Sequence, residues 1–98
     1  MTHDEFQKAL SRQISQLQTL LIAKNARYGN SALTAPTLCP VLTAKEGILV
    51  RLGDKFARLR QLTITDEVVA EEPLRDTVRD IIGYCVLWLI ADEEETKR

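Results

Sequence analysis

The sequence predicts a small all-α domain, and three observations support that prediction. Apolar residues recur at intervals of three and four in three separate segments, which is the spacing of amphipathic helices. Polar residues and prolines interrupt this pattern between the segments, as they do in loops. At 98 residues the chain has room for one domain. We therefore expect residues 1–98 to form a single domain of three helices, or of four if the first loop contains a short helix.

The composition indicates a soluble protein and limits the partners to expect. Hydrophobic residues make up 45% of the chain and charged residues 28%, as in ordinary globular domains. Thirteen basic and fourteen acidic side chains leave a net charge of −1, which is unlike a surface that coats nucleic acid. We expect no direct contact with nucleic acid, although a local basic patch can still bind the phosphate of a nucleotide.

Other features of the chain predict where it resides. Its N-terminus is polar, unlike a signal peptide, and its longest apolar run, residues 81–91, covers about half of a membrane span. We expect a buried helix there and no membrane contact. Cys39 and Cys85 have no paired spacing, so they fit neither a disulfide scaffold nor a zinc site. The reducing cytoplasm is the expected compartment.

The first predicted helix covers residues 2–26, and Thr2 or Asp4 can cap its start. Its apolar positions follow helical spacing and are Phe6, Leu10, Ile14, Leu17 and Leu21. Residues 27–43 form a loop by composition, and Gly29 permits a left-handed end to the helix. Beside it, Tyr28 either stacks on a nucleotide base or simply packs against the helix end.

The second predicted helix covers residues 44–62, with Thr43 as its cap and Glu46 three residues later. Its apolar stripe consists of Ile48, Leu52, Phe56 and Leu59. Basic residues follow one edge of that stripe, and they are Arg51, Lys55 and Arg58. Charges beside a core stripe are partly buried and need partners. These cations either pair with acids of the third helix or bind phosphate, which guanidinium groups hold in a bidentate fork.

The third predicted helix begins at Glu72–Pro73, because proline is favoured in a first helical turn, and it ends near Glu94. Its main apolar stripe consists of Leu74, Val78, Ile81, Cys85 and Leu89. The opposite face begins with Asp76 and Asp80 and then becomes apolar at Gly83, Leu87 and Ile90. A helix that is apolar all round must be buried all round, which three helices cannot easily achieve. We therefore expect a homo-oligomer; the alternative is a long helix with two ordinary exposed aspartates.

Carboxylates repeat every four residues at the start of the third helix, at Glu72, Asp76 and Asp80. Like charges so spaced repel one another, so cations should neutralise them. Mg²⁺ is one candidate, since it prefers carboxylate oxygens and commonly brings the phosphates of a substrate. Ion pairs with Arg75 and Arg79 are the simpler alternative.

Three blocks of residues in this order resemble the nucleotide-modification-associated domain of the first type, a small family frequent in bacteriophages and prophages. The blocks are Lys24-x3-Tyr28-Gly29-x-Ser31, Arg51-x2-Asp54-Lys55-x2-Arg58 and Glu72-x3-Asp76-Thr77-x2-Asp80-x3-Tyr84, and they span about two thirds of the chain. The helical pattern is also similar to that of the all-α nucleoside triphosphate pyrophosphatases of the MazG type, which hold Mg²⁺ with carboxylates on helices. Those enzymes carry Glu-x2-Glu and Glu-x2-Asp pairs, whereas the acids of this third helix are four residues apart.

The resemblance implies an all-helical phage protein that binds a nucleotide or a nucleotide-derived ligand in the cytoplasm of an infected or lysogenic host, and it leaves open whether the ligand is also processed. Its ligand site would consist of Lys24, Tyr28, Gly29, Ser31, Arg51, Lys55, Arg58 and Tyr84. A Mg²⁺-dependent nucleotide phosphohydrolase would use Asp54, Asp76 and Asp80 as catalytic residues and Glu72, Asp76 and Asp80 as metal ligands. The alternatives are a non-catalytic regulator or sponge that sequesters a nucleotide signal of host defence, and a structural oligomeric adaptor.

Overall fold

The computed structural model describes residues 1–64 and 71–97, without the side chains of residues 71 and 72. In these ranges the chain forms three long helices, α1 (His3–Tyr28), α2 (Ala44–Ile64) and α3 (Glu71–Thr96), and no strand. A short 3-10 helix, η1 (Ser31–Leu33), occupies part of the first loop. The predicted all-α fold is therefore confirmed, including a short helix in that loop. None of the described helices is both long enough and apolar enough to cross a membrane.

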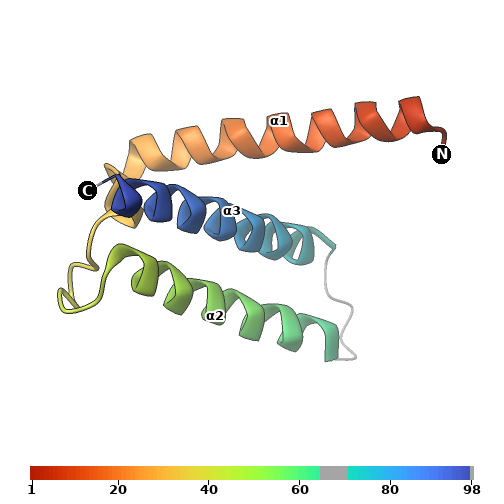
Figure 1. Ribbon diagram of the computed structural model, residues 1–98. Coiled ribbons are helices and arrows are strands. Elements are labelled where there is room, and N and C mark those ends of the chain that lie inside the picture. The colour runs from red at the N-terminus through yellow and green to blue at the C-terminus, as the bar shows by residue number, and fades with distance from the viewer. Residues whose placement is uncertain (65–70, 98) are drawn as a thin grey trace.

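The helices form an open arrangement in which α3 lies between α1 and α2 (Figure 1). Most tertiary contacts join α2 to α3, which run in opposite directions, and only a few join α1 to α3. α1 approaches α3 through its C-terminal half, while its N-terminal half extends away from the other helices. We call this extended half, residues 3–16, the N-terminal arm.

Local hydrogen bonds and backbone geometry explain where α1 begins and ends and where α2 begins. The Thr2 hydroxyl accepts a bond from the Glu5 amide at 3.1 Å, which caps the start of α1. α1 ends where Gly29 adopts a left-handed backbone with φ of 59°. Before α2, Thr43 and Glu46 form a reciprocal capping box with bonds of 2.9 and 3.1 Å. Each long helix ends two residues beyond its predicted end, whereas α2 begins at the predicted residue and α1 and α3 begin within one residue of it.

Few side chains in the described ranges are fully buried. They are concentrated where α2 packs against α3, and they comprise Ile48 of α2 together with Thr77 and Ala91 of α3. Thr77 is 2% exposed, and its hydroxyl donates a hydrogen bond of 2.8 Å to the Pro73 carbonyl. That bond satisfies the only polar group of a threonine side chain that would otherwise be costly to bury. The core is therefore a narrow seam between two helices.

The apolar stripes predicted for α2 and α3 are buried only in part, contrary to expectation. Phe56 in α2 and Val78 and Leu89 in α3 are exposed. α3 carries apolar residues on nearly every side of its second half, so their spacing does not specify which side packs against α2. The packed side contains Thr77 and Ala91 instead.

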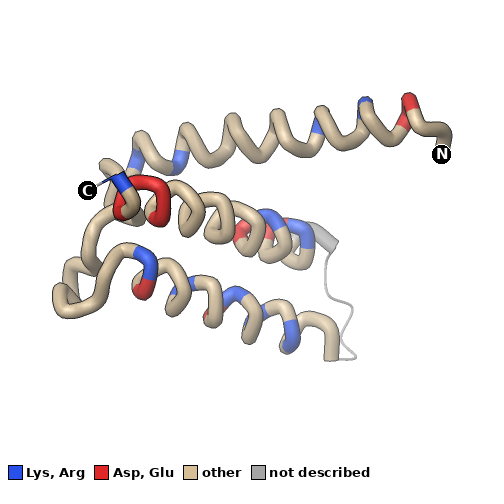
Figure 2. Tube along the Cα trace, in the orientation of Figure 1, with Lys and Arg blue, Asp and Glu red and all other residues tan. Residues whose placement is uncertain are grey.

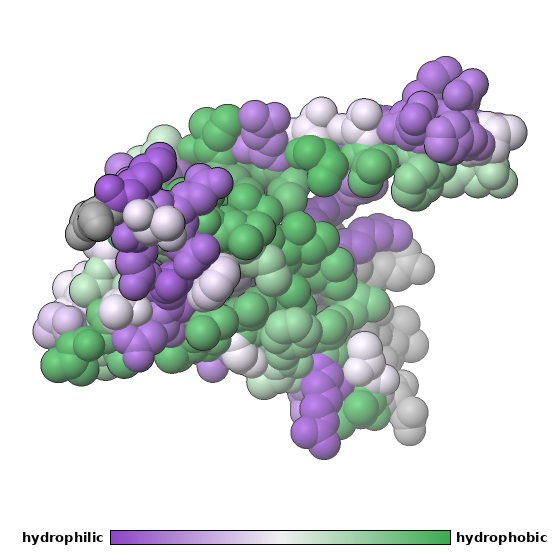
Figure 3. Space-filling view, in the orientation of Figure 1, coloured by the Kyte–Doolittle hydropathy of each residue, from purple (hydrophilic) through white to green (hydrophobic). Residues whose placement is uncertain are grey.

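The chain exposes more surface than a compact monomer of its size. Its accessible surface is 7763 Å², whereas a compact protein of 11.1 kDa exposes about 5,700 Å². Its radius of gyration is 15.8 Å, compared with about 13 Å for a compact domain of this length. Figure 3 shows hydrophobic side chains along the arm and across much of the surface beneath it. The open arrangement of the helices therefore leaves extensive apolar surface uncovered.

Candidate functional site

One cleft lies where the C-terminal half of α1 meets η1, α2 and α3. It has a volume of about 430 Å³, and the leucines of α1 and α3 supply part of its wall. Most of the predicted ligand residues line it, and they are Lys24, Tyr28, Ser31, Arg51, Lys55 and Tyr84. One of the predicted carboxylates, Asp80, lines it as well. Lys24 and Tyr84, which are 60 positions apart in sequence, therefore share one cavity.

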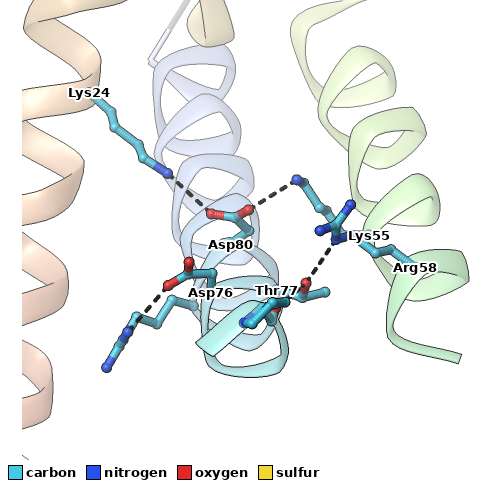
Figure 4. A network of polar contacts seen from close by, with 8 residues as sticks. Lys24, Lys55, Arg58, Asp76, Thr77 and Asp80 are labelled. Carbon is cyan, nitrogen blue, oxygen red and sulfur yellow. Dashed lines mark hydrogen bonds and ion pairs between the residues drawn. The ribbon is translucent and has the colours of Figure 1, made fainter. Parts of the chain in front are cut away.

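Asp80 connects all three long helices at the centre of this cleft (Figure 4). Lys24 of α1 donates to Asp80 Oδ1 at 3.1 Å, and Lys55 of α2 lies 3.0 Å from Asp80 Oδ2. Burial raises the pKa of the Asp80 carboxyl, but the hydrogen bonds and charges of Lys55 and Lys24 outweigh it and leave the pKa below its ordinary value. The carboxylate is therefore ionised and holds both ammonium groups in the cleft.

Positive charge exceeds negative charge along the cleft wall. Lys24, Arg51, Lys55 and Arg79 are four basic residues against the single carboxylate of Asp80, an excess of three charges. Figure 2 shows where α2 and the start of α3 carry their basic residues. Among the described residues Arg51 has no ion-pair partner, and Arg79 pairs only with Asp76 at 3.5 Å. An anion entering this cleft would therefore meet incompletely neutralised cations.

Two tyrosines supply aromatic surface to the same cleft. Tyr28, the last residue of α1, has 60% of its surface exposed, whereas Tyr84 of α3 is partly buried. Gly29 does not line the cleft, but its left-handed backbone turns the chain directly after Tyr28. The side-chain amide of Asn25 donates to the side chain of Asn30, which bridges that turn. The turn therefore fixes where the exposed tyrosine lies.

Gly83 allows α1 to approach α3 at the floor of the cleft. A Cβ atom at this position would lie 3.1 Å from Leu21 Cδ2, which is tighter than most real contacts of a Cβ atom. Both residues line the cleft. A larger side chain in place of Gly83 would push the leucine, and with it α1, away from α3.

Two predicted site residues on α2 lie outside the cleft. The Arg58 guanidinium donates from Nε to Thr77 Oγ1 at 3.3 Å, so it ties α2 to α3 beside the core (Figure 4). Asp54 is exposed and does not line the cleft. The structure therefore separates Arg58 and Asp54 from the other members of the second sequence block.

The predicted carboxylate set is only partly assembled. Asp76 lies one turn before Asp80 on α3 but is largely exposed and pairs with Arg79. The Glu72 side chain lies outside the described residues. Within the described part of the chain, no group of three or more His, Cys, Asp and Glu side chains is placed to hold a metal ion. Because both Asp80 oxygens already contact lysines, Mg²⁺ would have to displace them, and magnesium binding at Glu72, Asp76 and Asp80 stays a prediction.

No family model, curated protein or solved structure matches this chain. The resemblance to the nucleotide-modification-associated family therefore stays a prediction.

Asn25 and Arg79 line the cleft but were not predicted as ligand residues. The sequence predicts Arg79 as an ion-pair partner of the neighbouring acids, and in the structure it contacts Asp76. The signal available in the sequence was position: Arg79 directly precedes Asp80, and Asn25 directly follows Lys24. That signal becomes useful only once α1 is known to cross α3 at this level.

A second polar cluster joins α2 to the C-terminal end of α3. Lys45 contacts Asp92 at 3.1 Å and Glu95 at 2.8 Å, and its ammonium lies 5.3 Å from the centre of the Trp88 ring. The hydrogen bonds that Lys45 donates to Glu95 and, with a smaller effect, to Asp92 raise the pKa of Lys45. Trp88 Nε1 is buried and has no hydrogen-bond partner among the described residues. This cluster lies outside the cleft and fastens the start of α2 to α3.

Proposed function

We propose that the cleft binds the phosphate groups of a nucleotide or a nucleotide-derived ligand. The single observation that carries this proposal is the excess of basic residues, contributed by three separate helices, around one small cavity. Arginine and lysine side chains form the strongest hydrogen bonds to phosphate oxygens because both partners are charged. A volume of about 430 Å³ falls within the usual range for small-molecule sites.

The two ends of the cleft suit the two parts of a nucleotide. Lys24, Lys55 and Arg51 would receive the phosphates, since Asp80 already gathers the two lysines at one position. Tyr28 offers an exposed ring on which a base can stack, and the neighbouring leucine side chains provide apolar contact. Ser31 adds a hydroxyl for the ribose or a phosphate.

Asp80 acts in this proposal as an internal counter-ion. Its carboxylate offsets the repulsion between Lys24 and Lys55 and keeps both ammonium groups close to the cavity when no ligand is bound. A bound phosphate would share these lysines with the carboxylate and be repelled by it. The residue therefore organises the site and lowers its affinity at the same time.

A nucleotide panel with a matched pair of arginine variants tests the proposal. Arg51→Ala should weaken binding about tenfold, because a charge-assisted hydrogen bond contributes roughly 1.5–3 kcal/mol. Arg60→Ala is the control, since Arg60 is an exposed arginine of the same helix that does not line the cleft. Isothermal titration calorimetry with nucleoside triphosphates and cyclic nucleotides measures both. Equal weakening by the two variants, or no binding by the unaltered protein, would refute the proposal.

Mg²⁺-dependent phosphohydrolysis is the second candidate, favoured by the position of Asp76 one turn from Asp80 beside the basic residues. Incubation of ligand with Mg²⁺ or with EDTA, followed by chromatography of the products, separates it from simple binding. Turnover that requires Mg²⁺ and is abolished by Asp80→Ala would support an enzyme. Ligand recovered intact after heating would support a regulator or a sponge that sequesters a nucleotide signal in a phage-infected bacterial cytoplasm.

We also infer that the functional form is a homo-oligomer. The chain exposes about 2,000 Å² more than a compact protein of its mass, and much of the excess is apolar. Obligate homodimers bury roughly 2,000–5,000 Å² in total, so self-association can cover a surface of this size. Concentration-dependent sedimentation tests this inference without any ligand.

A further inference from the structure

The helix α1 carries one apolar stripe that the rest of the chain covers only at its C-terminal end. Leu17 and Leu21 are partly buried, and Leu21 contacts α3 beside Gly83. In the N-terminal arm the same stripe continues through Phe6, Leu10 and Ile14, which are 53%, 50% and 56% exposed. Figure 3 shows hydrophobic side chains along the edge of the arm that faces the other helices. The arm therefore extends a packing surface beyond the element against which it packs.

A second copy of this chain is the occupant that the surface area favours. A helix of about 14 residues with a single apolar face is marginal in water unless that face is covered. The whole chain has an excess surface of about 2,000 Å², which is comparable with the area that an obligate dimer buries. A partner with a long apolar helix face can cover the arm and the remaining part of the stripe together. The α1 helix of a second copy provides such a face.

The order of residues in α1 specifies one direction and one register for such pairing. Leu10, Ile14, Leu17 and Leu21 are placed symmetrically about the midpoint between residues 15 and 16. The first turn of α1 is acidic, with Asp4 and Glu5, and its last turn is basic, with Arg27. Antiparallel helices bring the acidic turn of each copy to the basic end of the other and align the helix dipoles favourably, whereas parallel helices place like charges together.

We propose that two copies of the chain pair through antiparallel α1 helices centred between residues 15 and 16. Leu10 then packs against the part of Leu21 of the second copy that its own α3 leaves exposed, and Ile14 packs against the exposed part of Leu17 of the second copy. Each arm is covered by the C-terminal half of the other copy's α1. The dimer has two-fold symmetry, so both arms are satisfied by the same interface.

This register places the tip of each arm at the cleft of the other copy. Phe6 of the second copy lies level with Asn25, which lines the cleft one turn before Tyr28. The arm would therefore close one side of the ligand cavity with an apolar ring. This consequence rests on the proposed function of the cleft, whereas the helix pairing itself does not.

Cross-linking of cysteine variants tests the direction of the pairing. In a background of Cys39→Ser and Cys85→Ser, which removes the two native thiols, Leu10→Cys and Leu21→Cys are made separately and then mixed. Antiparallel pairing predicts a disulfide-linked dimer in the mixture and little in either variant alone. Efficient linkage within each variant alone would indicate parallel helices and overturn the proposal. Circular dichroism of each variant confirms that the helices are retained.

A matched pair of exposed isoleucines tests the surface itself. Ile14→Glu should convert the dimer to a monomer, with the self-dissociation constant raised at least a hundredfold in sedimentation equilibrium. Ile22→Glu is the control, since Ile22 is 64% exposed on the same helix but lies outside the stripe. Both side chains are exposed in the single chain, so neither change removes a core contact. An unaltered protein that is monomeric at every concentration would overturn the proposal. The same holds if the monomer instead binds lipid vesicles through the arm.

Ligand binding by the monomeric variant then tests the closed cleft separately. Ile14→Glu should weaken nucleotide binding about tenfold relative to Ile22→Glu if the second copy's arm covers the cavity. Equal binding by the two variants would overturn the closure of the cleft and leave the pairing intact. Loss of dimerisation needs no ligand for its detection, so failure of the proposed function and failure of the pairing give different results.

Discussion

Asp80 shows how one side chain can organise a site made from three helices. Its two oxygens contact Lys24 and Lys55, which belong to α1 and α2. The Asp80 side chain is 22% exposed, so solvent screens these contacts less than it screens ordinary surface ion pairs. A ligand or a metal ion bound in this cleft would therefore meet the Asp80 carboxylate.

Replacing Asp80 by asparagine distinguishes a phosphate-binding site from a metal site by the sign of the change in nucleotide affinity. Asp80→Asn removes a negative charge from the cleft while it keeps the shape of the side chain, so nucleotide binding should strengthen by about tenfold, or ~1.4 kcal/mol. Calorimetry or fluorescence polarisation with a labelled nucleotide measures the change. A comparable loss of affinity that occurs with Mg²⁺ and is absent with EDTA would instead indicate that Asp80 binds the metal.

The lowered pKa of Asp80 predicts how stability depends on pH. Because the pKa of the folded protein lies below the unfolded value near 3.8, the stabilisation is fully present above pH 3.8 and is lost as pH falls through the folded pKa. Asp80→Asn should therefore reduce the free energy of unfolding by on the order of 1 kcal/mol at pH 7. Urea unfolding from pH 7 down to pH 2.5 should show this difference shrinking below pH 4. A difference that does not vary with pH would contradict the assignment.

At the scale of elements, the pair formed by α2 and α3 contains nearly all of the buried contacts. Ile48 is 1% exposed against α3, and Arg58 and Thr77 add a polar tie beside it. Lys45 with Asp92 and Glu95 fastens the opposite end of the pair. α1 depends on fewer contacts and should unfold locally at a lower free energy than the pair.

Removing one buried side chain tests the importance of that seam. Ile48→Ala should lower the free energy of unfolding by about 2–4 kcal/mol, since it removes buried methylene groups and leaves a cavity. Val50→Ala is the control on the same helix, because Val50 is 57% exposed and should change stability by less than about 1 kcal/mol. Chemical unfolding followed by circular dichroism compares them. Similar losses for the two variants would show that the core lies elsewhere in the assembled protein.

The whole molecule is more open than a compact domain of its length. Its radius of gyration of 15.8 Å and its exposed stripe on α1 indicate that a large part of its stabilising surface is not used within one chain. Association would supply that burial, and it would link folding to protein concentration. Folding and association would then be coupled in one equilibrium.

That linkage predicts a melting temperature that depends on concentration. Raising the protein concentration a hundredfold should raise Tm by several degrees in the unaltered chain, because the associated state is stabilised by mass action. Ile14→Glu should melt at a lower temperature that does not vary with concentration. Differential scanning fluorimetry and circular dichroism over that range provide the measurement. A Tm of the unaltered protein that is constant across it would contradict self-association.

The helices and their ends were largely predictable, because they depend on interactions between neighbours in sequence. Thr2, Gly29 and the pair of Thr43 and Glu46 form the caps that their residue types favour. The charge pattern also identified the main members of the cleft, since Arg51, Lys55 and Asp80 occupy helix faces that their spacing defines. Local chemistry was sufficient for the helix ends, whereas the same charge pattern also included Arg58 and Asp54, which do not line the cleft.

The sequence by itself determined three helices, their caps and the faces on which acids and bases lie. Only the tertiary structure decided that Asp80 faces Lys24 across 56 positions, that Arg58 serves Thr77 and that Asp54 is left outside the cleft. It also decided which side of α3 packs against α2. The physical reason is that the rotation and crossing of packed helices depend on side chains from distant segments, so no local pattern specifies them.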